Sequence, residues 1–94
     1  MGVISRNWKH GVIMGYDGNL VQYRNKKPVW TTRTQGNKGA YAVMQTDGNL
    51  VVYLGRKALW SSKTHGRRGA YLITHEAGDT VIYHGRQRIW TTGR

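Results

Sequence analysis

The chain lacks cysteine and phenylalanine altogether, and it has a single proline, Pro28. Without cysteine it has no disulfide framework, no thiolate nucleophile and no cysteine-ligated metal site. Its N-terminal part has no apolar run longer than residues 12–14, so we find no signal peptide, and no stretch approaches the ~20 apolar residues of a membrane span. We expect a secreted protein whose leader has been removed, with a cytoplasmic location as the alternative.

Acidic residues are scarce as well. Four Asp and Glu oppose 15 Lys and Arg, which gives a net charge of +11. Such a charge favours anionic partners, for example nucleic acid, anionic lipid or acidic cell-envelope polymers. Three of the acids, Asp17, Asp47 and Asp79, lie in one repeated segment, which indicates that they serve a local purpose.

The sequence repeats with a period of thirty residues. The spacing is shared by three sets of residues: Trp30, Trp60 and Trp90; Tyr23, Tyr53 and Tyr83; Val21, Val51 and Val81. The tripeptide Asp-Gly-Asn at 17–19 and 47–49 has become Ala-Gly-Asp at 77–79. These copies predict a single domain, residues 1–94, built from units of about 1–30, 31–60 and 61–90 plus a closing strand over 91–94.

Each unit has the pattern of β-structure. Short apolar runs cover 10–14, 40–45 and 70–75, alternating segments cover 19–24, 49–54 and 79–84, and Trp-containing segments cover 28–33, 58–63 and 88–92. An Asp-Gly pair before an alternating segment favours a β-hairpin. No convincing helical period is present, so the expected fold class is all-β.

Three equal units predict three antiparallel sheets around a pseudo-threefold axis, because one small sheet cannot bury its own face. The three Trp residues would meet at this axis, and each buried indole N–H would need an acceptor. We expect the segment 91–94 to complete the first sheet. It would come from the same chain or from a partner chain, and the second case gives a homodimer by C-terminal strand exchange.

A row of polar side chains follows the hairpin turn of the second unit. The two-residue period places Asn49, Val51 and Tyr53 on one face, with Gln45 and Asp47 beside them at the turn. This arrangement predicts a shallow polar surface with a small apolar floor, which suits a ligand rich in hydroxyl groups. The alternative is that these residues serve only turn geometry and half-buried packing.

The pattern Gln45-x-Asp47-x-Asn49-x-Val51-x-Tyr53 resembles, at all five positions, the QxDxNxVxY signature of the monocot (bulb-type) mannose-binding lectins. The thirty-residue repeat resembles that family over essentially the whole chain. The resemblance implies a β-prism II fold and binding of mannose-containing glycans without catalysis, metal or cofactor. It also implies that Asp47 and Asn49 bind the axial 2-hydroxyl, Gln45 the 3-hydroxyl and Tyr53 the 4-hydroxyl, while Val51 packs on the sugar's C–H face.

The same resemblance implies unequal sites in the other two copies. The first copy has Gly15 in place of Gln and keeps four positions: Asp17, Asn19, Val21 and Tyr23. We expect it to bind weakly or to accept a different sugar. The third copy keeps Val81 and Tyr83 but has His75, Ala77 and Asp79 at the other positions. We do not expect this copy to bind mannose.

Other function classes remain as alternatives. A cationic lectin-like antibacterial protein of the bacteriocin type would bind the anionic bacterial envelope, and its binding would fall with salt and ignore free mannose. Nucleic-acid binding lacks a recognised module. A glycosidase needs two carboxylates roughly 5–10 Å apart, whereas Asp17 and Asp47 belong to different sheets. The four histidines show no spacing typical of a metal site or catalytic triad.

Overall fold

The computed structural model describes residues 2–5 and 8–93, and within these ranges the chain forms ten β-strands. No helix in the described part is long and apolar enough to cross a bilayer. The strands are β1 (Gly2–Ile4), β2 (His10–Met14), β3 (Leu20–Arg24), β4 (Lys27–Thr31), β5 (Tyr41–Met44), β6 (Leu50–Leu54), β7 (Lys57–Ser61), β8 (Tyr71–Thr74), β9 (Thr80–His84) and β10 (Gln87–Thr91).

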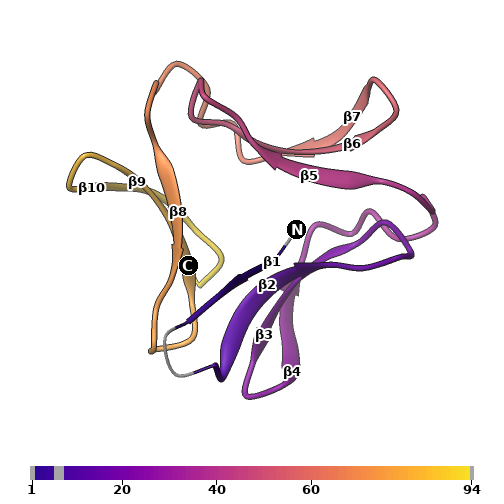
Figure 1. Cartoon of the computed structure of the whole chain (residues 1–94), viewed down its shortest axis with the longest axis horizontal. Helices are drawn as coiled ribbons and strands as arrows, with labels where there is room; N and C mark the ends of the chain where they lie inside the picture. Colours follow the sequence, from indigo (N-terminus) through magenta and orange to yellow (C-terminus); the bar gives the residue numbers. More distant parts are fainter. Residues whose placement is uncertain (1, 6–7, 94) are drawn as a thin grey trace.

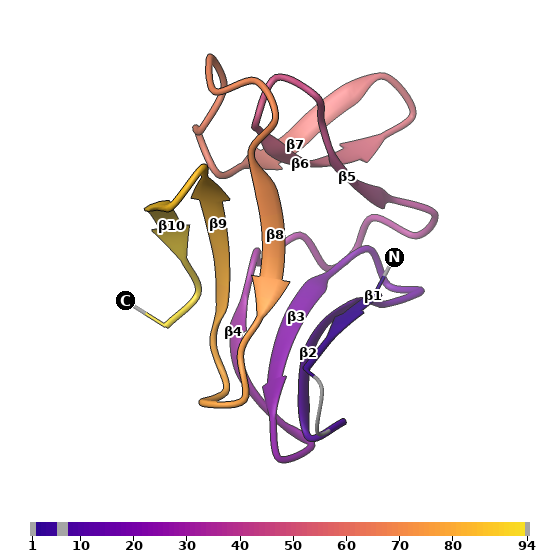
Figure 2. The ribbon, with the colours of Figure 1, turned by 60° about the vertical axis from the view of Figure 1, so that its left-hand side comes forward.

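Each repeat folds into its own antiparallel sheet, and the three sheets surround a common centre (Figure 1). The first sheet has the order β1-β2-β3-β4, the second β5-β6-β7 and the third β10-β9-β8. Strand β8 runs beside the first sheet (Figure 2), where Thr74 Oγ1 donates a hydrogen bond to Val3 O at 2.9 Å. The all-β arrangement of three sheets predicted from the repeat is confirmed.

The turn before each central strand is a three-residue hairpin loop. In the second repeat Gly48 N donates to Gln45 O at 3.0 Å, and Gln45 N donates to Asn49 O at 2.8 Å. Gly48 has a φ of 93°, which glycine adopts without steric cost. A Cβ at this position would also lie 2.3 Å from Arg67 O. The predicted hairpin is confirmed. Glycine is required at position 48 because its φ is positive and because the backbone of Arg67 lies too close for a side chain.

A β-bulge in the tryptophan-containing strand of each sheet directs its tryptophan toward the centre. In the second sheet Trp60 pairs with Val52 and Ala58 pairs with Tyr53, so Leu59 is an extra residue on β7. Trp60 therefore lies on the same face as Val52, which is fully buried. Strands β4 and β10 show the same register shift.

The three indoles meet at the centre of the molecule. Trp30, Trp60 and Trp90 contact one another edge to face, with ring centroids 5.5, 5.4 and 5.7 Å apart. Each aromatic pair of this kind contributes about 0.5–1.5 kcal/mol beyond area burial. The expected acceptors for the indole N–H groups are absent among the described residues. That expectation is wrong because the rings are only half-buried, and no buried side-chain nitrogen in this part of the chain lacks a partner.

The core departs from threefold symmetry between the first and third sheets. Gln22 stands where the other repeats have Val52 and Ile82, and Thr80 stands where they have leucine; both polar residues are fully buried. Gln22 Nε2 donates to Gly78 O at 3.0 Å, and Thr80 Oγ1 donates to Gln22 Oε1. A buried polar pair therefore joins the first and third sheets, whereas the equivalent positions of the second repeat are aliphatic.

The fourth strand of the first sheet is β1, which pairs antiparallel with β2. Thr91 instead pairs with Val81 in the third sheet, and Thr92 N donates to Thr80 O at 2.9 Å. The expectation that the segment 91–94 completes the first sheet is therefore wrong for residues 91–93, because β1 already occupies that edge; Arg94 lies outside the described residues. Strand exchange between two chains stays a prediction, and it would require these bonds to be released.

The polar pair makes a testable contribution to stability. Gln22→Val and Thr80→Leu introduce the residues that the second repeat has at these positions. Each single change should lower the free energy of unfolding by about 1–3 kcal/mol, because it removes the buried hydrogen bond between Gln22 and Thr80. The double variant should lose less than the sum, by about 0.5–3 kcal/mol. Urea denaturation of all four proteins measures this difference, and strictly additive losses would contradict the coupling.

Candidate saccharide-binding site

The five residues predicted from the signature lie together in the second sheet, on β6 and in the hairpin loop before it. Asn49, Val51 and Tyr53 alternate with Leu50 and Val52, which are buried in the core. Asp47 is exposed, whereas Gln45, Asn49 and Tyr53 are half-buried. The structure thus places the polar members of the set at the surface, on the side of the sheet that faces away from the core.

The Asn49 amide has one end bound by the protein. Its Oδ1 accepts hydrogen bonds from Thr64 N and Ser62 Oγ, both at 3.2 Å. The loop that supplies them is fixed in turn, because Thr64 Oγ1 donates to Gly48 O at 2.6 Å. Its Nδ2 donates to no residue in the described part of the chain. The hydrogen bonds from Ser62 and Thr64 therefore fix the orientation of the amide and leave its N–H₂ group available to a ligand.

The Asp47 carboxylate likewise has one oxygen held by the protein and one oxygen left free. Its Oδ1 accepts a hydrogen bond from Asn49 N at 3.0 Å, which closes a local turn. Its Oδ2 has no hydrogen bond with any described residue. A hollow of about 240 Å³ opens beside this carboxylate, between Thr46, Gly66 and Arg68. The free carboxylate oxygen is therefore a strong acceptor, although Asn49 is not among the residues that line this hollow.

Gln45 and Tyr53 form the other end of the row. Gln45 Nε2 donates to the Tyr53 hydroxyl, so the hydroxyl proton and Gln45 Oε1 are left for a ligand. Tyr41 supports the Tyr53 ring from the neighbouring strand, with stacked rings 5.8 Å apart. The Tyr41 hydroxyl donates to Gly55 O at 2.9 Å, which fixes its position.

Val51 presents little surface to a ligand. It lies in the central strand between Val43 and Ser61, and it is only 3% exposed. Neighbouring strands therefore cover most of the Val51 side chain in the absence of a ligand. A sugar would contact this residue over a small area.

The first repeat has the same hydrogen-bonding frame with one part missing. Asn19 Oδ1 accepts from Thr34 N at 3.2 Å and from Thr32 Oγ1 at 3.3 Å, and Asp17 Oδ1 accepts from Asn19 N at 3.0 Å. Because Gly15 replaces the glutamine, the Tyr23 hydroxyl has no hydrogen-bond partner among the described residues. Val21 is half-buried at the corresponding position of β3.

The third repeat has a different set of contacts. Asp79 forms an ion pair with Arg88 at 3.1 Å, and Thr91 Oγ1 donates to the same carboxylate oxygen at 3.4 Å. His75 Nε2 contacts the Tyr83 hydroxyl at 2.7 Å. An aspartate offers no N–H group, and its charge is already engaged by the guanidinium. This position therefore lacks the donor that Asn49 supplies, and Val81 beside it is fully buried.

Sequence reasoning missed the residues that hold the site in place. Ser62, Thr64 and Tyr41 each fix a member of the set, and each has a counterpart in another repeat: Thr32, Thr34 and Tyr71. The thirty-residue spacing could have identified all three pairs. Within residues 2–5 and 8–93, no three His, Asp or Glu side chains come together as a metal site.

Comparison with solved structures places this geometry in a family. A monomeric monocot mannose-binding lectin from Gastrodia elata is 35% identical, with a TM-score of 0.84 over 98% of this chain and 88% of that chain. The snowdrop (Galanthus nivalis) agglutinin, solved with methyl-α-D-mannoside, is 36% identical, with a TM-score of 0.77 over 99% and 90%. The Polygonatum cyrtonema lectin, complexed with a monomannoside, is 29% identical, with a TM-score of 0.75 over 99% and 90%.

No family model and no curated protein sequence matches the chain. The structural matches combine the whole fold with more than 30% identity over nearly the full length of both chains. The chain therefore belongs to the monocot mannose-binding lectin family, and its three sheets form the β-prism II fold.

A stability measurement should distinguish the role of the Asn49 amide oxygen from that of its N–H₂ group. Asn49→Ala removes the acceptor of the Thr64 N–H, and it should lower the free energy of unfolding by about 1–3 kcal/mol. Asn49→Asp keeps a carbonyl-like oxygen and should retain most of that stability. Urea denaturation distinguishes the two, with the exposed Thr46→Ala as a control. Equal losses for both Asn49 variants would show that the Oδ1 contacts do not support the loop.

Proposed function

We propose that this protein is a lectin that binds mannose-containing glycans through the second repeat, with Gln45, Asp47, Asn49, Val51 and Tyr53 as the contact residues. It binds without catalysis, metal or cofactor. The snowdrop and Polygonatum lectins were both solved with mannosides, and this chain shares their fold over 99% of its length. The family resemblance gives the roles of the five residues, and the local hydrogen bonds support them.

The observation that carries the proposal is that each polar residue has one hydrogen-bonding group held by the protein and another left for a ligand. Asn49 offers N–H donors, Asp47 and Gln45 offer oxygen acceptors, and Tyr53 offers an O–H donor. Adjacent donors and acceptors in fixed directions match vicinal hydroxyl groups, each of which both donates and accepts. A preorganised site of this kind avoids part of the entropy cost of binding.

The proposed pose predicts that the site selects mannose over its 2-epimer. In the proposed pose the axial 2-hydroxyl lies between Asp47 and Asn49, donating to the carboxylate and accepting from the amide. A sugar with an equatorial 2-hydroxyl leaves these two groups without partners, and unpaired polar groups are costly. The 3-hydroxyl then meets Gln45 and the 4-hydroxyl meets Tyr53.

We propose unequal use of the three repeats. The first repeat lacks one hydrogen-bond acceptor and binds mannose more weakly. The third repeat does not bind mannose because the carboxylate of Asp79 is paired with the guanidinium of Arg88. A single shallow site gives weak binding, so attachment to a cell surface requires several sites to act together. A homodimer would provide such avidity.

The second candidate function is that of a cationic antibacterial protein, and it rests on the net charge of +11. Attraction to anionic envelope polymers would add to sugar binding at low ionic strength and would be screened at high ionic strength. The lectin structures that the chain resembles support sugar recognition as the main activity.

Asp47→Asn tests the proposal, because it keeps the Oδ1 contact to Asn49 N and replaces the free acceptor by a donor. Loss of a hydrogen bond to a charged group costs about 1.5–3 kcal/mol, so affinity of the second site for methyl α-mannoside should fall at least roughly tenfold. Isothermal calorimetry at low and high salt measures this affinity. The wild-type value should change little with salt, and methyl α-glucoside should not compete.

The matched control is Asp17→Asn in the first repeat, which should leave the stronger binding component unchanged. Two results would overturn the proposal. One is an Asp47→Asn variant that binds methyl α-mannoside like the wild type. The other is cell binding that disappears with salt and is indifferent to free mannoside, which would favour the charge-based reading.

A further inference from the structure

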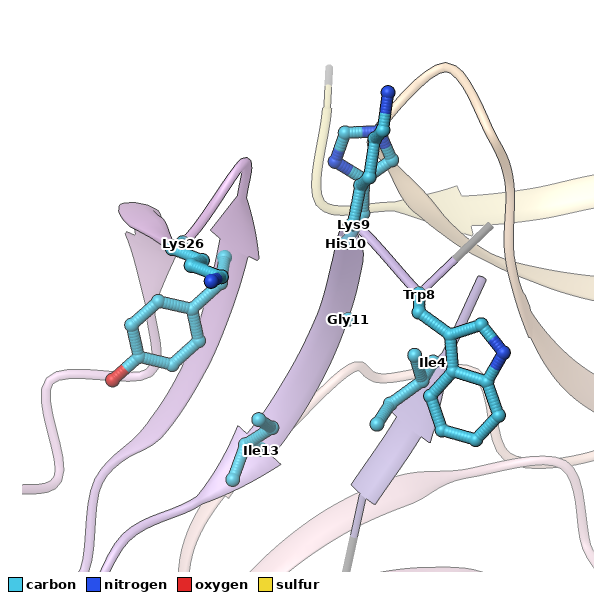
Figure 3. A pocket seen from close by; sticks show the side chains of 8 residues that line it. Ile4, Trp8, Lys9, His10, Gly11, Ile13 and Lys26 are labelled. Carbon is cyan, nitrogen blue, oxygen red and sulfur yellow. The ribbon is translucent and has the colours of Figure 1, made fainter. Parts of the chain in front are cut away.

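A second hollow lies on the outer face of the first sheet, about 250 Å³ in volume and mainly apolar in its lining. It is bordered by Ile4, Trp8, Gly11, Ile13 and Tyr23, and we call it the Trp8 hollow. Figure 3 shows Trp8 and Ile4 on one side of Gly11 and Lys26 on the other. The Trp8 side chain is 81% exposed, so its indole is available at the surface.

The hollow lies where the first repeat has glycine and the other two repeats have tyrosine. A Cβ at Gly11 would lie 2.7 Å from Val3 O, so the added strand β1 leaves no room for a larger side chain there. In the second and third sheets, Tyr41 and Tyr71 pair with Tyr53 and Tyr83 and stack on them at 28°. In the first sheet Gly11 is the partner of Tyr23. The Tyr23 ring therefore lacks the covering ring that its two counterparts have.

Tyr23 links the hollow to the first candidate sugar site. The Tyr53 hydroxyl is bonded to Gln45 and the Tyr83 hydroxyl to His75, whereas the Tyr23 hydroxyl has no such partner among the described residues. The first site is thus missing a polar contact on the side where the hollow opens. Tyr23 is the residue that the two features share, and it lies on β3 opposite Gly11 of β2.

We propose that the Trp8 hollow binds the second sugar ring of a glycan whose first ring is held by Asp17, Asn19 and Tyr23. This inference rests on the proposed function, because it extends a sugar site of the same design. The first repeat would then recognise an oligosaccharide, whereas the second repeat recognises a single terminal unit.

The lining of the hollow favours a pyranose ring. The face of an aromatic ring carries negative charge density, and the C–H face of a hexose is apolar with weakly positive hydrogens, so the two attract and bury apolar area together. The volume is below the roughly 300–1,000 Å³ of pockets for drug-sized ligands and suits a single ring. Ile13, which is 42% exposed, and Trp8 provide the accessible apolar surface of the hollow.

The experiment isolates the first site by using Asp47→Asn as the background. In calorimetry, linear α-linked mannotriose should bind this protein roughly tenfold more tightly than methyl α-mannoside. Adding Trp8→Ala should reduce that ratio to about twofold or less and leave the affinity for methyl α-mannoside unchanged. Trp8→Phe, which keeps an aromatic face, should retain most of the ratio.

A matched control uses Asn19→Asp to disable the first site. There the ratio of mannotriose to methyl α-mannoside affinity at the second site should not respond to Trp8→Ala. Thermal unfolding of each variant confirms that it is folded.

Failure of this inference differs from failure of the proposed function. If wild-type protein binds mannoside but Trp8→Ala leaves the mannotriose ratio intact, the hollow is not a subsite, and the second-repeat site stands. If the Asp47→Asn protein binds neither sugar, the inference is overturned too, because no first ring is held there. If the wild type binds no mannoside at all, both fail.

Discussion

Edge-to-face contact among three tryptophans is the interaction on which the rest of this structure depends. Trp30, Trp60 and Trp90 tie together sheets that are individually too small to bury a face. A bulge in β4, β7 and β10 is what directs each indole inward. Because the inner face of every sheet is committed to this centre, the outer face of every central strand is left for binding. The fold therefore presents three related surfaces, and their side chains decide which ones function.

The candidate site is rigid because the repeats brace one another locally. The loop after β7 supplies the donors that orient Asn49, and β5 supplies the ring that supports Tyr53. Binding groups are thus set before a ligand arrives, which is how a shallow site can discriminate between epimers. Divergence between repeats then acts on individual contacts: a glycine removes an acceptor in the first copy, and an arginine neutralises the aspartate of the third.

Much of this could be read from the sequence, because a strict thirty-residue period carries both the fold and the location of the site. The strand positions, the hairpin before β6 and the meeting of the tryptophans follow from that period. What it could not give are the features that break it. Among the described residues, strand β1 has no counterpart in the other two sheets. Gln22 is buried where the other repeats have an aliphatic residue, and Gly11 lines a hollow where they have tyrosine. The near-complete burial of Val51 and the half-burial of the three tryptophans depend on side-chain packing, which the thirty-residue spacing does not specify.

The central claim is that the outward polar groups of the second repeat bind one hexose through its axial 2-hydroxyl. A crystal structure of the complex with methyl α-mannoside tests it most directly. The account predicts the sugar against β6, with its 2-hydroxyl oxygen within hydrogen-bonding distance of Asn49 Nδ2 and of the free oxygen of Asp47. A sugar bound elsewhere, with the Asn49 and Asp47 side chains making no contact to it, would contradict the account.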